Sequence, residues 1–343
     1  MVQDPHLRGS TSDWLTDRAA RGLLGAIMRL PFETRVRTMG RIMAKGIGPL
    51  SGYRKRAETH LALIYPDMSA AEQRKIATQV CDNFGRTLIE NYSWRELGAR
   101  LSQTAPQGAG LAPLAEARAQ NRPVIFVTGH IGNHEAPRHV LTQSGLVIGG
   151  LYRPMANPYF NTHYAKTMSS WGGPVFAQGR RGTAGFAKHL KSGGMATLLF
   201  DVASSKGTNI PFLGQLARTA TSAADLALRS EALVIPYFGI RRDDGFGFDV
   251  HVEAPIAQAT PEIMMTEMTT RLEARVRATP GQWFWVHRRW KQPQSAQLIN
   301  FAAPTTGPFV PSCTMTASCC APATSASSEI GERPSHCPIT SSD

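Results

Sequence analysis

Between residues 106 and 292, short apolar runs alternate with segments of helical periodicity. Amphipathic patterns typical of helices lie between several runs, for instance over 183–191 and 219–230. Six runs have the length and composition of buried strands: 124–128, 146–152, 174–177, 196–200, 233–240 and 248–254. This alternation predicts an α/β fold with a mostly parallel or mixed sheet flanked by helices. In such sheets, ligands bind at the carboxyl ends of the strands.

The pattern changes on both sides of this segment, which divides the chain into three parts. Residues 1–105 are predicted to be helical, and a helix over 69–95 starts with a capping box of Ser69 and Glu72. Residues 106–293 form the predicted α/β core. Residues 294–343 are rich in Ser, Thr, Pro, Ala and Cys without periodicity, which predicts a disordered tail.

The charge of the chain indicates an anionic partner. Lys and Arg number 37 and Asp and Glu number 25, which leaves a net charge of +12. Up to residue 58 there are 11 basic and 5 acidic residues, interleaved with Leu, Ile and Met. This composition favours interfacial helices on an anionic leaflet. The stretch 22–32 is too short and too charged to predict a spanning helix, and residues 1–14 do not resemble a secretory signal.

The segment VTGHIGNHEAPRH, residues 127–139, follows the first predicted strand and concentrates polar side chains there. If the chain turns at Gly132, His130 and Glu135 can converge, and a carboxylate on one imidazole nitrogen makes the other a general base. A metal site on His130 and His134 is a second interpretation, although H-x-x-x-H-E is neither the zincin motif nor its inverse. An ordinary polar loop is the third.

Support for nucleophilic catalysis is weak. The chain has no G-x-S-x-G motif, and Cys81, which lies within the predicted 69–95 helix, is expected to be a core residue. The segment GRRGTAG (179–185) has no Walker lysine, so a turn before a helix is the better interpretation. The remaining four cysteines lie in the tail, so the body is not a disulfide scaffold.

The segment 127–135 resembles the H-x₄-D/E motif of glycerolipid-type acyltransferases. Further segments resemble the lipid A biosynthesis (lauroyl/myristoyl) acyltransferase family, in the same order along the chain. They are the helical region that starts with HLALIYPD at residue 60, LYRPMANPYFN (151–161), LLFDVASSKGTNIPFLG (198–214), SEALVIPYFGIRRDDG (230–245) and QWFWVHRRWK (282–291). The resemblance covers about residues 15–292.

This resemblance implies a sandwich-like acyltransferase core preceded by helices that contact a membrane. The implied reaction moves a fatty acyl chain from an acyl carrier protein or coenzyme A thioester to a hydroxyl group of a glycolipid. A lipid A precursor is the expected acceptor, and phosphatidylinositol mannoside is the alternative. No other cofactor and no nucleic acid partner are implied. The expected location is the cytoplasmic face of the bacterial inner membrane, with peripheral or shallow anchoring.

Carried over by position, His130 is expected to be the general base and Glu135 its orienting partner. Arg153 and Asp201 are expected to line the same cleft. The tetrahedral oxyanion needs hydrogen-bond donors, for which the backbone amides around Gly132–Asn133 or the guanidinium of Arg153 are candidates. Catalysis through a base needs no covalent enzyme intermediate, which is consistent with the missing nucleophile motif.

Arg288 and Arg289 belong to the basic VHRR segment and are expected to contact a phosphorylated substrate. Two positions depart from the family pattern. His134 stands where a Trp or another large apolar residue is usual, and Val202 stands where Gln is usual, which affects the expected acceptor pocket. Two functions of other classes remain as alternatives: a metal-dependent hydrolase using His130 and His134, and a non-catalytic basic protein that binds nucleic acid.

Overall fold

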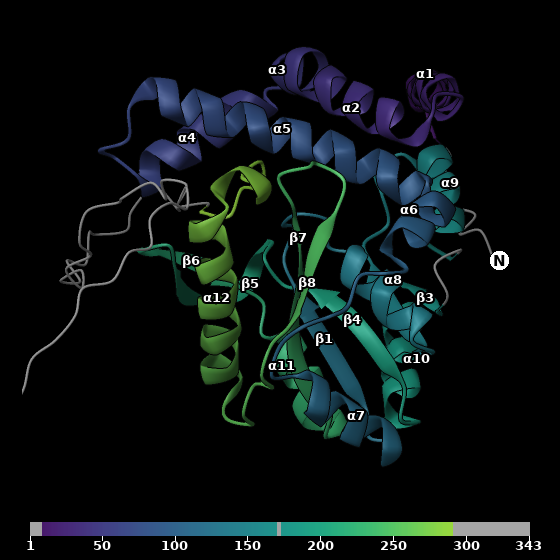
Figure 1. Cartoon of the computed structure of the whole chain (residues 1–343). Helices are drawn as coiled ribbons and strands as arrows, with labels where there is room; N and C mark the ends of the chain where they lie inside the picture. Colours follow the sequence, from purple (N-terminus) through teal and green to yellow (C-terminus); the bar gives the residue numbers. More distant parts are fainter. Residues whose placement is uncertain (1–8, 170–172, 291–343) are drawn as a thin grey trace, which may run out of the picture. The chain divides into compact units, whose positions relative to one another are not determined.

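The computed structural model describes residues 9–169 and 173–290, which belong to one compact unit (Figure 1). A six-stranded sheet in the order β3-β2-β4-β1-β7-β8 forms its centre. The strands are β1 (Val124–Thr128), β2 (Ile148–Tyr152), β3 (Val175–Ala177), β4 (Met195–Leu199), β7 (Leu233–Arg241) and β8 (Phe248–Val252). All pairs are parallel except β7 with β8. The predicted α/β fold with a mixed sheet is therefore confirmed.

Each of the six predicted apolar runs forms one of these strands, with ends that differ from the prediction by at most two residues. A separate antiparallel pair, β5 (Ala203–Phe212) and β6 (Gln215–Thr219), was not predicted. Its sequence lacks a long apolar run, because along most of β5 the side chains are at least partly exposed and only Ile210 and Phe212 are buried. The burial of a few residues against the body stabilises this pair, and local propensity does not reveal it.

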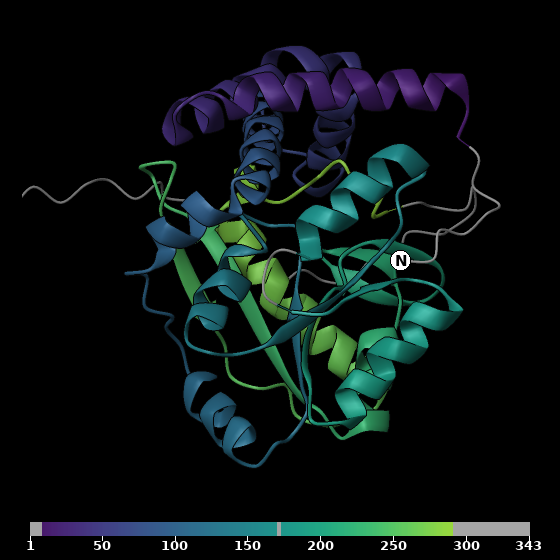
Figure 2. The same ribbon diagram turned by 90° about the vertical axis from the view of Figure 1, so that its right-hand side faces the viewer.

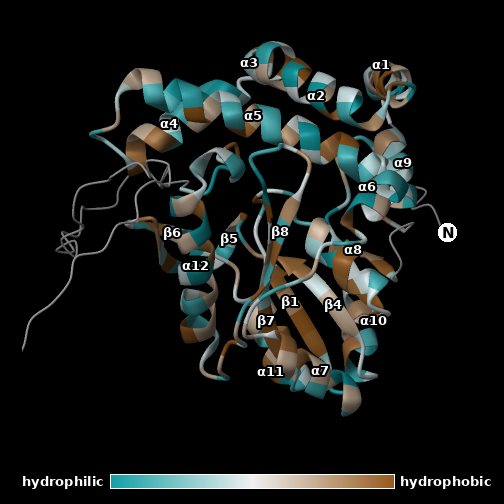
Figure 3. Cartoon of the chain, in the orientation of Figure 1, coloured by the Kyte–Doolittle hydropathy of each residue, from teal (hydrophilic) through white to brown (hydrophobic). Residues whose placement is uncertain are grey.

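Helices cover both faces of the sheet. On one face lie α10 (Arg180–Lys191), α11 (Ser222–Ser230) and α12 (Pro261–Ala278), and on the other lie α7 (Leu111–Ala119) and α8 (Ala136–Gln143). The side chains of β1 alternate accordingly: Ile125 and Val127 pack toward the first face, and Val124 and Phe126 toward the second. All five residues of β1 are buried, which matches its mostly hydrophobic colour in Figure 3.

The amino-terminal part is helical, as predicted, and lies across the carboxyl end of the sheet. Figures 1 and 2 show these helices at the top, with α5 directly above the strands. In order they are α1 (Thr11–Met28), α2 (Phe32–Ile42), a π-helical turn (Met43–Ile47), α3 (Gly48–Leu50), α4 (Tyr53–Ile64), α5 (Ala70–Tyr92) and α6 (Trp94–Leu101). Among residues 9–169 and 173–290, no helix combines the length and apolarity needed to cross a bilayer. A further helix, α9 (Pro158–Met168), packs against α1.

Two local expectations can be compared directly. The capping box of Ser69 and Glu72 starts α5, with both reciprocal hydrogen bonds formed. Cys81 lies in the core, where burial raises the pKa of its thiol to about 11. The predicted tail over residues 294–343 lies outside the described residues.

Candidate active site

His130 and Asp201 meet at the carboxyl edge of the sheet. His130 follows β1 and Asp201 follows β4, and these parallel neighbours are in register, with Thr128 opposite Leu199. Oδ1 of Asp201 lies 2.7 Å from Nδ1 of His130, and its Oδ2 accepts the backbone N–H of the same histidine at 2.7 Å. The indole N–H of Trp283 also donates to Oδ2, at 2.9 Å. The carboxylate is thus held on three sides.

This geometry prepares His130 for proton transfer through its outer nitrogen. A carboxylate on Nδ1 selects the tautomer that carries its proton there and leaves the lone pair on Nε2. Burial alone would raise the pKa of the Asp201 carboxyl. However, the charge of His130 and the hydrogen bonds it donates outweigh burial and hold that pKa well below its usual range. The side chain of His130 is 28% exposed and that of Asp201 is 1% exposed, so the histidine can reach a substrate and the carboxylate cannot.

Glu135 does not hold the position expected for an orienting partner. Its carboxylate is buried, with Oε2 3.5 Å from Nη1 of Arg138 and Oε1 3.9 Å from Nε2 of His134. Burial raises the pKa of Glu135, and the charge of Arg138 opposes this effect. The carboxylate on Nδ1 of His130 is that of Asp201, so Asp201 occupies the position expected of Glu135. The spacing of the motif does not reveal this exchange, because Asp201 comes from another strand.

The loop after His130 is held by backbone contacts that use its amide groups. Gly132 has a φ of +54°, and a Cβ there would lie 1.9 Å from the carbonyl oxygen of Gly239, so only glycine fits. The N–H of Gly132 donates to the carbonyl of Gln282 at 3.1 Å, and the N–H of Asn133 donates to that of Gly239 at 3.0 Å. Both amides expected to stabilise an oxyanion are therefore occupied by the fold.

A buried polar network on α5 supports the same loop. Thr87 donates to the carbonyl of Gly132 at 2.8 Å. Glu90 forms a bidentate pair with Arg241 and accepts a hydrogen bond from the side-chain amide of Asn133 at 3.0 Å. The side chains of Glu90 and Arg241 are 0% and 7% exposed. The sequence analysis did not predict this pair, although an acidic residue on the apolar face of a helix was a signal that could have indicated it.

Two further histidines surround His130. The ring centroid of His134 lies 5.4 Å from that of His130, and the ring centroid of His287 lies 4.4 Å away, edge to face. Burial, followed by the charge of His130, lowers the pKa of both His134 and His287 to about 3, so both are neutral at pH 7. His287 was not among the predicted site residues, although it belongs to the VHRR segment that marks the family.

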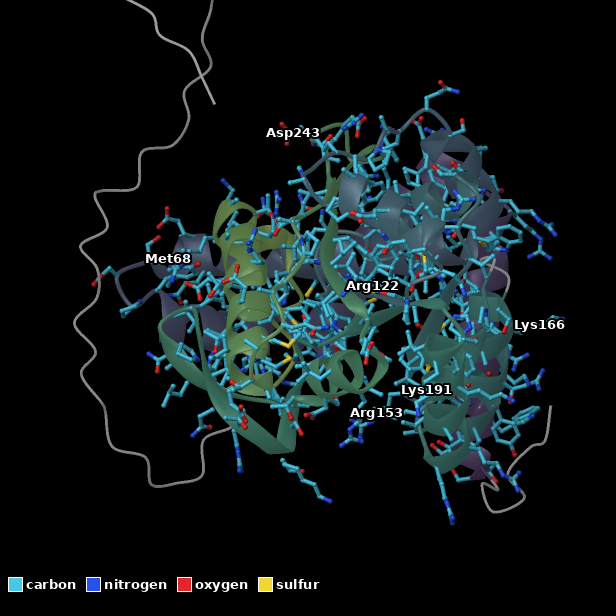
Figure 4. The ribbon with its side chains drawn as sticks, turned by 90° about the horizontal axis from the view of Figure 1, so that it is seen from below. Met68, Arg122, Arg153, Lys166, Lys191 and Asp243 are labelled. Carbon is cyan, nitrogen blue, oxygen red and sulfur yellow. The ribbon has the colours of Figure 1, made fainter. Side chains whose placement is uncertain are left out.

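The three predicted substrate arginines occupy different environments. Arg153 follows β2 directly and is exposed, at the periphery of the view in Figure 4. Arg288 is exposed as well. Arg289 is 1% exposed and donates to the carbonyl of Arg218 at 3.0 Å and to Oγ1 of Thr219 at 2.6 Å. Burial lowers the pKa of Arg289 to about 10. Arg289 therefore binds β6 through these hydrogen bonds, whereas the sequence predicted a contact with the substrate.

The alternative prediction, a metal site on His130 and His134, can be compared with the positions of these side chains. Within the described part of the chain, no three His, Cys, Asp or Glu side chains are grouped so that they could hold a metal ion. One nitrogen of His130 is already engaged by Asp201, and His134 lies against Glu135.

Fold and site together describe a candidate acid–base enzyme, with a histidine at the carboxyl edge of a mixed α/β sheet. Residues 4–292 match the family model of the bacterial lipid A biosynthesis acyltransferases, so the chain belongs to that family and is an acyltransferase. It is 26% identical over 297 residues to the lipid A biosynthesis lauroyltransferase of Escherichia coli K12, a match that covers 81% of this chain and 92% of that protein.

Two other relatives have similar names. A lipid A biosynthesis acyltransferase of Haemophilus influenzae is 21% identical over 263 residues, which cover 75% of this chain and 81% of that protein. The lipid A biosynthesis myristoyltransferase of Escherichia coli K12 is 21% identical over 250 residues, which cover 71% and 77%. The family recognised from the sequence motifs is thus confirmed, and it implies a lipid acceptor.

Proposed function

We propose that the protein transfers a fatty acyl chain from an acyl carrier protein thioester, or from acyl-coenzyme A, to a hydroxyl group of a lipid A precursor. The observation that carries this proposal is the 2.7 Å contact between Nδ1 of His130 and Asp201, which leaves Nε2 of an accessible imidazole as a base. The names of the relatives support the choice of acceptor.

In the proposed reaction, Nε2 of His130 removes the hydroxyl proton as the oxygen attacks the thioester carbonyl. The tetrahedral intermediate collapses, the carbon–sulfur bond breaks, and the imidazolium returns the proton to the leaving thiolate. Asp201 stabilises the imidazolium and stays ionised throughout. Because the amides of Gly132 and Asn133 are occupied, the exposed guanidinium of Arg153 is the proposed donor to the oxyanion. No cofactor beyond the thioester takes part.

We further propose that the protein works at the cytoplasmic face of the inner membrane, bound through α1–α3 of its amino-terminal part. Large apolar side chains are exposed there: Leu50 is 90% exposed, Leu15 57% and Trp14 44%. Arg41 and Lys45 line the same shallow groove as Leu50. Apolar side chains flanked by cations favour docking on an anionic leaflet.

The test combines the His130→Gln substitution with a panel of acceptors. Labelled acyl carrier protein thioester or acyl-coenzyme A is incubated with a lipid A precursor, phosphatidylinositol mannoside and ordinary phospholipids, and mass spectrometry identifies the lipid that gains the acyl mass. We expect the lipid A precursor to gain it, and His130→Gln to lower kcat by about 10²–10⁴-fold. Retained turnover in a folded His130→Gln variant would refute the base assignment, and acylation of another lipid would refute the acceptor.

A further inference from the structure

A groove of about 590 Å³ runs between α10 and α11, on the face of the sheet that these helices cover. Its apolar lining includes Ala184 and Ala187 of α10 and Leu226 of α11. Its charged lining consists of three cations, which are Arg180 and Lys191 on α10 and Arg229 on α11. Arg180, Ala184, Ala187 and Lys191 are spaced by four, three and four residues, so they form one stripe along the helix.

These three cations have no carboxylate partner among the residues that the structure describes. Arg180, Lys191 and Arg229 are exposed, and within the described ranges none of them forms an ion pair. From residue 136 to residue 200 the sequence has seven Lys and Arg and no Asp or Glu. Elsewhere, exposed arginines such as Arg242 and Arg277 have carboxylate partners, whereas others, such as Arg95, have none among the described residues. The groove is therefore a surface of uncompensated positive charge that contains apolar side chains.

One end of the groove lies at the catalytic edge of the sheet. α10 starts at Arg180, directly after β3 ends at Ala177, and β3, β2, β4 and β1 are linked by parallel pairing. The Arg180 end is therefore on the same edge as His130 and Asp201. Lys191 and Arg229, near the ends of their helices, mark the other end. The 12 residues of α10 span about 18 Å, which is the length of a short docking helix.

We propose that the α10–α11 groove docks an acidic amphipathic helix of the protein that carries the acyl thioester, an inference that rests on the proposed function. Carboxylates of that helix meet Arg180, Lys191 and Arg229, and its apolar side chains pack on Ala184, Ala187 and Leu226. The flexible arm that bears the thioester then passes the Arg180 end to reach His130. This placement separates the two substrates. Figures 1 and 2 both show α10 and α11 far from α1–α3, so a molecule bound to lipid through α1–α3 keeps the groove free for a soluble partner.

Charge reversal in the full-length protein tests the docking surface. Arg180→Glu/Arg229→Glu and Lys191→Glu are compared with Lys75→Glu, a matched reversal of an exposed lysine on α5. Binding of fluorescently labelled acyl carrier protein is measured by anisotropy, and KM and kcat are measured with the acylated carrier and with small, neutral acyl-pantetheine. We expect the double reversal to raise both Kd and KM for the carrier at least about tenfold. Turnover with acyl-pantetheine and the behaviour of Lys75→Glu should stay within about twofold of the wild type.

Salt dependence provides a second readout. For the wild type, we expect Kd for the carrier to rise as salt increases from about 0.05 M to about 0.3 M, and we expect this dependence to weaken in the double reversal. Groove variants that bind the carrier as tightly as the wild type would overturn the proposal, and so would groove variants whose defect lies in KM for the lipid. Carrier binding that depends on the groove, without acyl transfer to any lipid, would instead refute the proposed function and leave the docking surface intact.

Discussion

At the scale of single residues, one carboxylate decides how the candidate base is oriented. Asp201 accepts hydrogen bonds from the ring and the backbone of His130 and from Trp283, whereas Glu135 faces Arg138. An imidazole fixed at both its backbone and its Nδ1 loses little entropy when it reaches the transition state. The five-residue spacing of His130 and Glu135 makes them neighbours in the chain without making them hydrogen-bond partners.

Asp201→Asn should lower kcat by about 10²–10⁴-fold, because an amide neither stabilises the imidazolium nor fixes the tautomer of His130. Glu135→Gln should lower kcat less and reduce the free energy of unfolding, because it leaves the buried Arg138 without a charged partner. Steady-state kinetics with each purified variant, together with chemical denaturation, provide the comparison. A loss of kcat in Glu135→Gln as large as that in Asp201→Asn would return the orienting role to Glu135.

His134 and His287 should make stability depend on pH. Their pKa is about 3 in the folded protein and about 6.5 in an unfolded chain, so the unfolded state binds more protons between these values. The stabilisation is complete above pH 6.5 and is lost as pH falls toward 3. Each histidine contributes up to about 1.4 kcal/mol per pH unit to this slope.

Urea denaturation at several pH values between 4 and 7 checks this expectation. His134→Phe should make the free energy of unfolding depend less steeply on pH, because phenylalanine binds no proton. The free energy of unfolding of the same variant at pH 7 is the reference for its values at lower pH. An unchanged dependence on pH would show that the pKa of His134 does not differ between the folded and unfolded states.

At the scale of elements, α5 determines the conformation of the catalytic loop. Its polar side chains Asn83, Thr87 and Glu90 contact Gly132, Asn133 and Arg241 through buried hydrogen bonds. The partners of these side chains lie on the loop after His130 and on β7, and not on α5 itself. We therefore assign Glu90 and Arg241 to the positioning of the loop that carries His130.

Removing one partner of the buried Glu90–Arg241 pair should lower the free energy of unfolding strongly, and replacing both partners should lower it less. Glu90→Leu should destabilise the protein by about 3–5 kcal/mol, because it leaves Arg241 buried and unpaired. The double variant Glu90→Leu/Arg241→Met should recover most of that loss and yet keep a reduced kcat, since Asn133 loses its acceptor. A double variant as unstable as Glu90→Leu would contradict the pairing, and full activity in it would contradict the positioning role.

At the scale of the whole described unit, the two proposed docking surfaces lie on different elements. The exposed apolar side chains of α1 and α3 lie beside cations at one end, and the α10–α11 groove lies on the flank of the sheet. Both surfaces lie toward the carboxyl edge where His130 and Asp201 meet, because the amino-terminal helices cross that end of the sheet and α10 begins there (Figure 1). A lipid acceptor and a protein-bound donor can therefore approach one site from separate directions.

Leu50→Asp should weaken binding to anionic vesicles by at least about tenfold, because burial of a leucine in a bilayer interface contributes about 1.5–3 kcal/mol. Val147→Asp is the matched control, since Val147 is 60% exposed and lies outside the amino-terminal helices. Co-sedimentation with vesicles of phosphatidylglycerol and phosphatidylethanolamine measures both variants. Equal weakening by Val147→Asp, or none by Leu50→Asp, would refute this docking surface.

Local patterns in the sequence predicted the strands of the main sheet, the helical amino-terminal part and the family. Apolar runs predicted all six strands of the main sheet, and the capping box of Ser69 and Glu72 predicted the start of α5. The motifs made His130 the candidate base. These features depend on residues that are close together in the sequence, so they can be predicted without knowing the tertiary structure. The β5–β6 pair was missed because its polar strands gain their stability from contacts elsewhere in the fold.

The pairing of side chains within the site was decided by the tertiary structure alone. His130 and Asp201 are 71 residues apart, and they meet because β1 and β4 pair in parallel with Thr128 opposite Leu199. Arg241 and Glu90 are 151 residues apart, and they meet because α5 crosses the end of the sheet. The sequence determined which residues could do acid–base chemistry. The register of strands and the crossing of a helix, which are long-range properties, decided which of these side chains lie within hydrogen-bonding distance of one another.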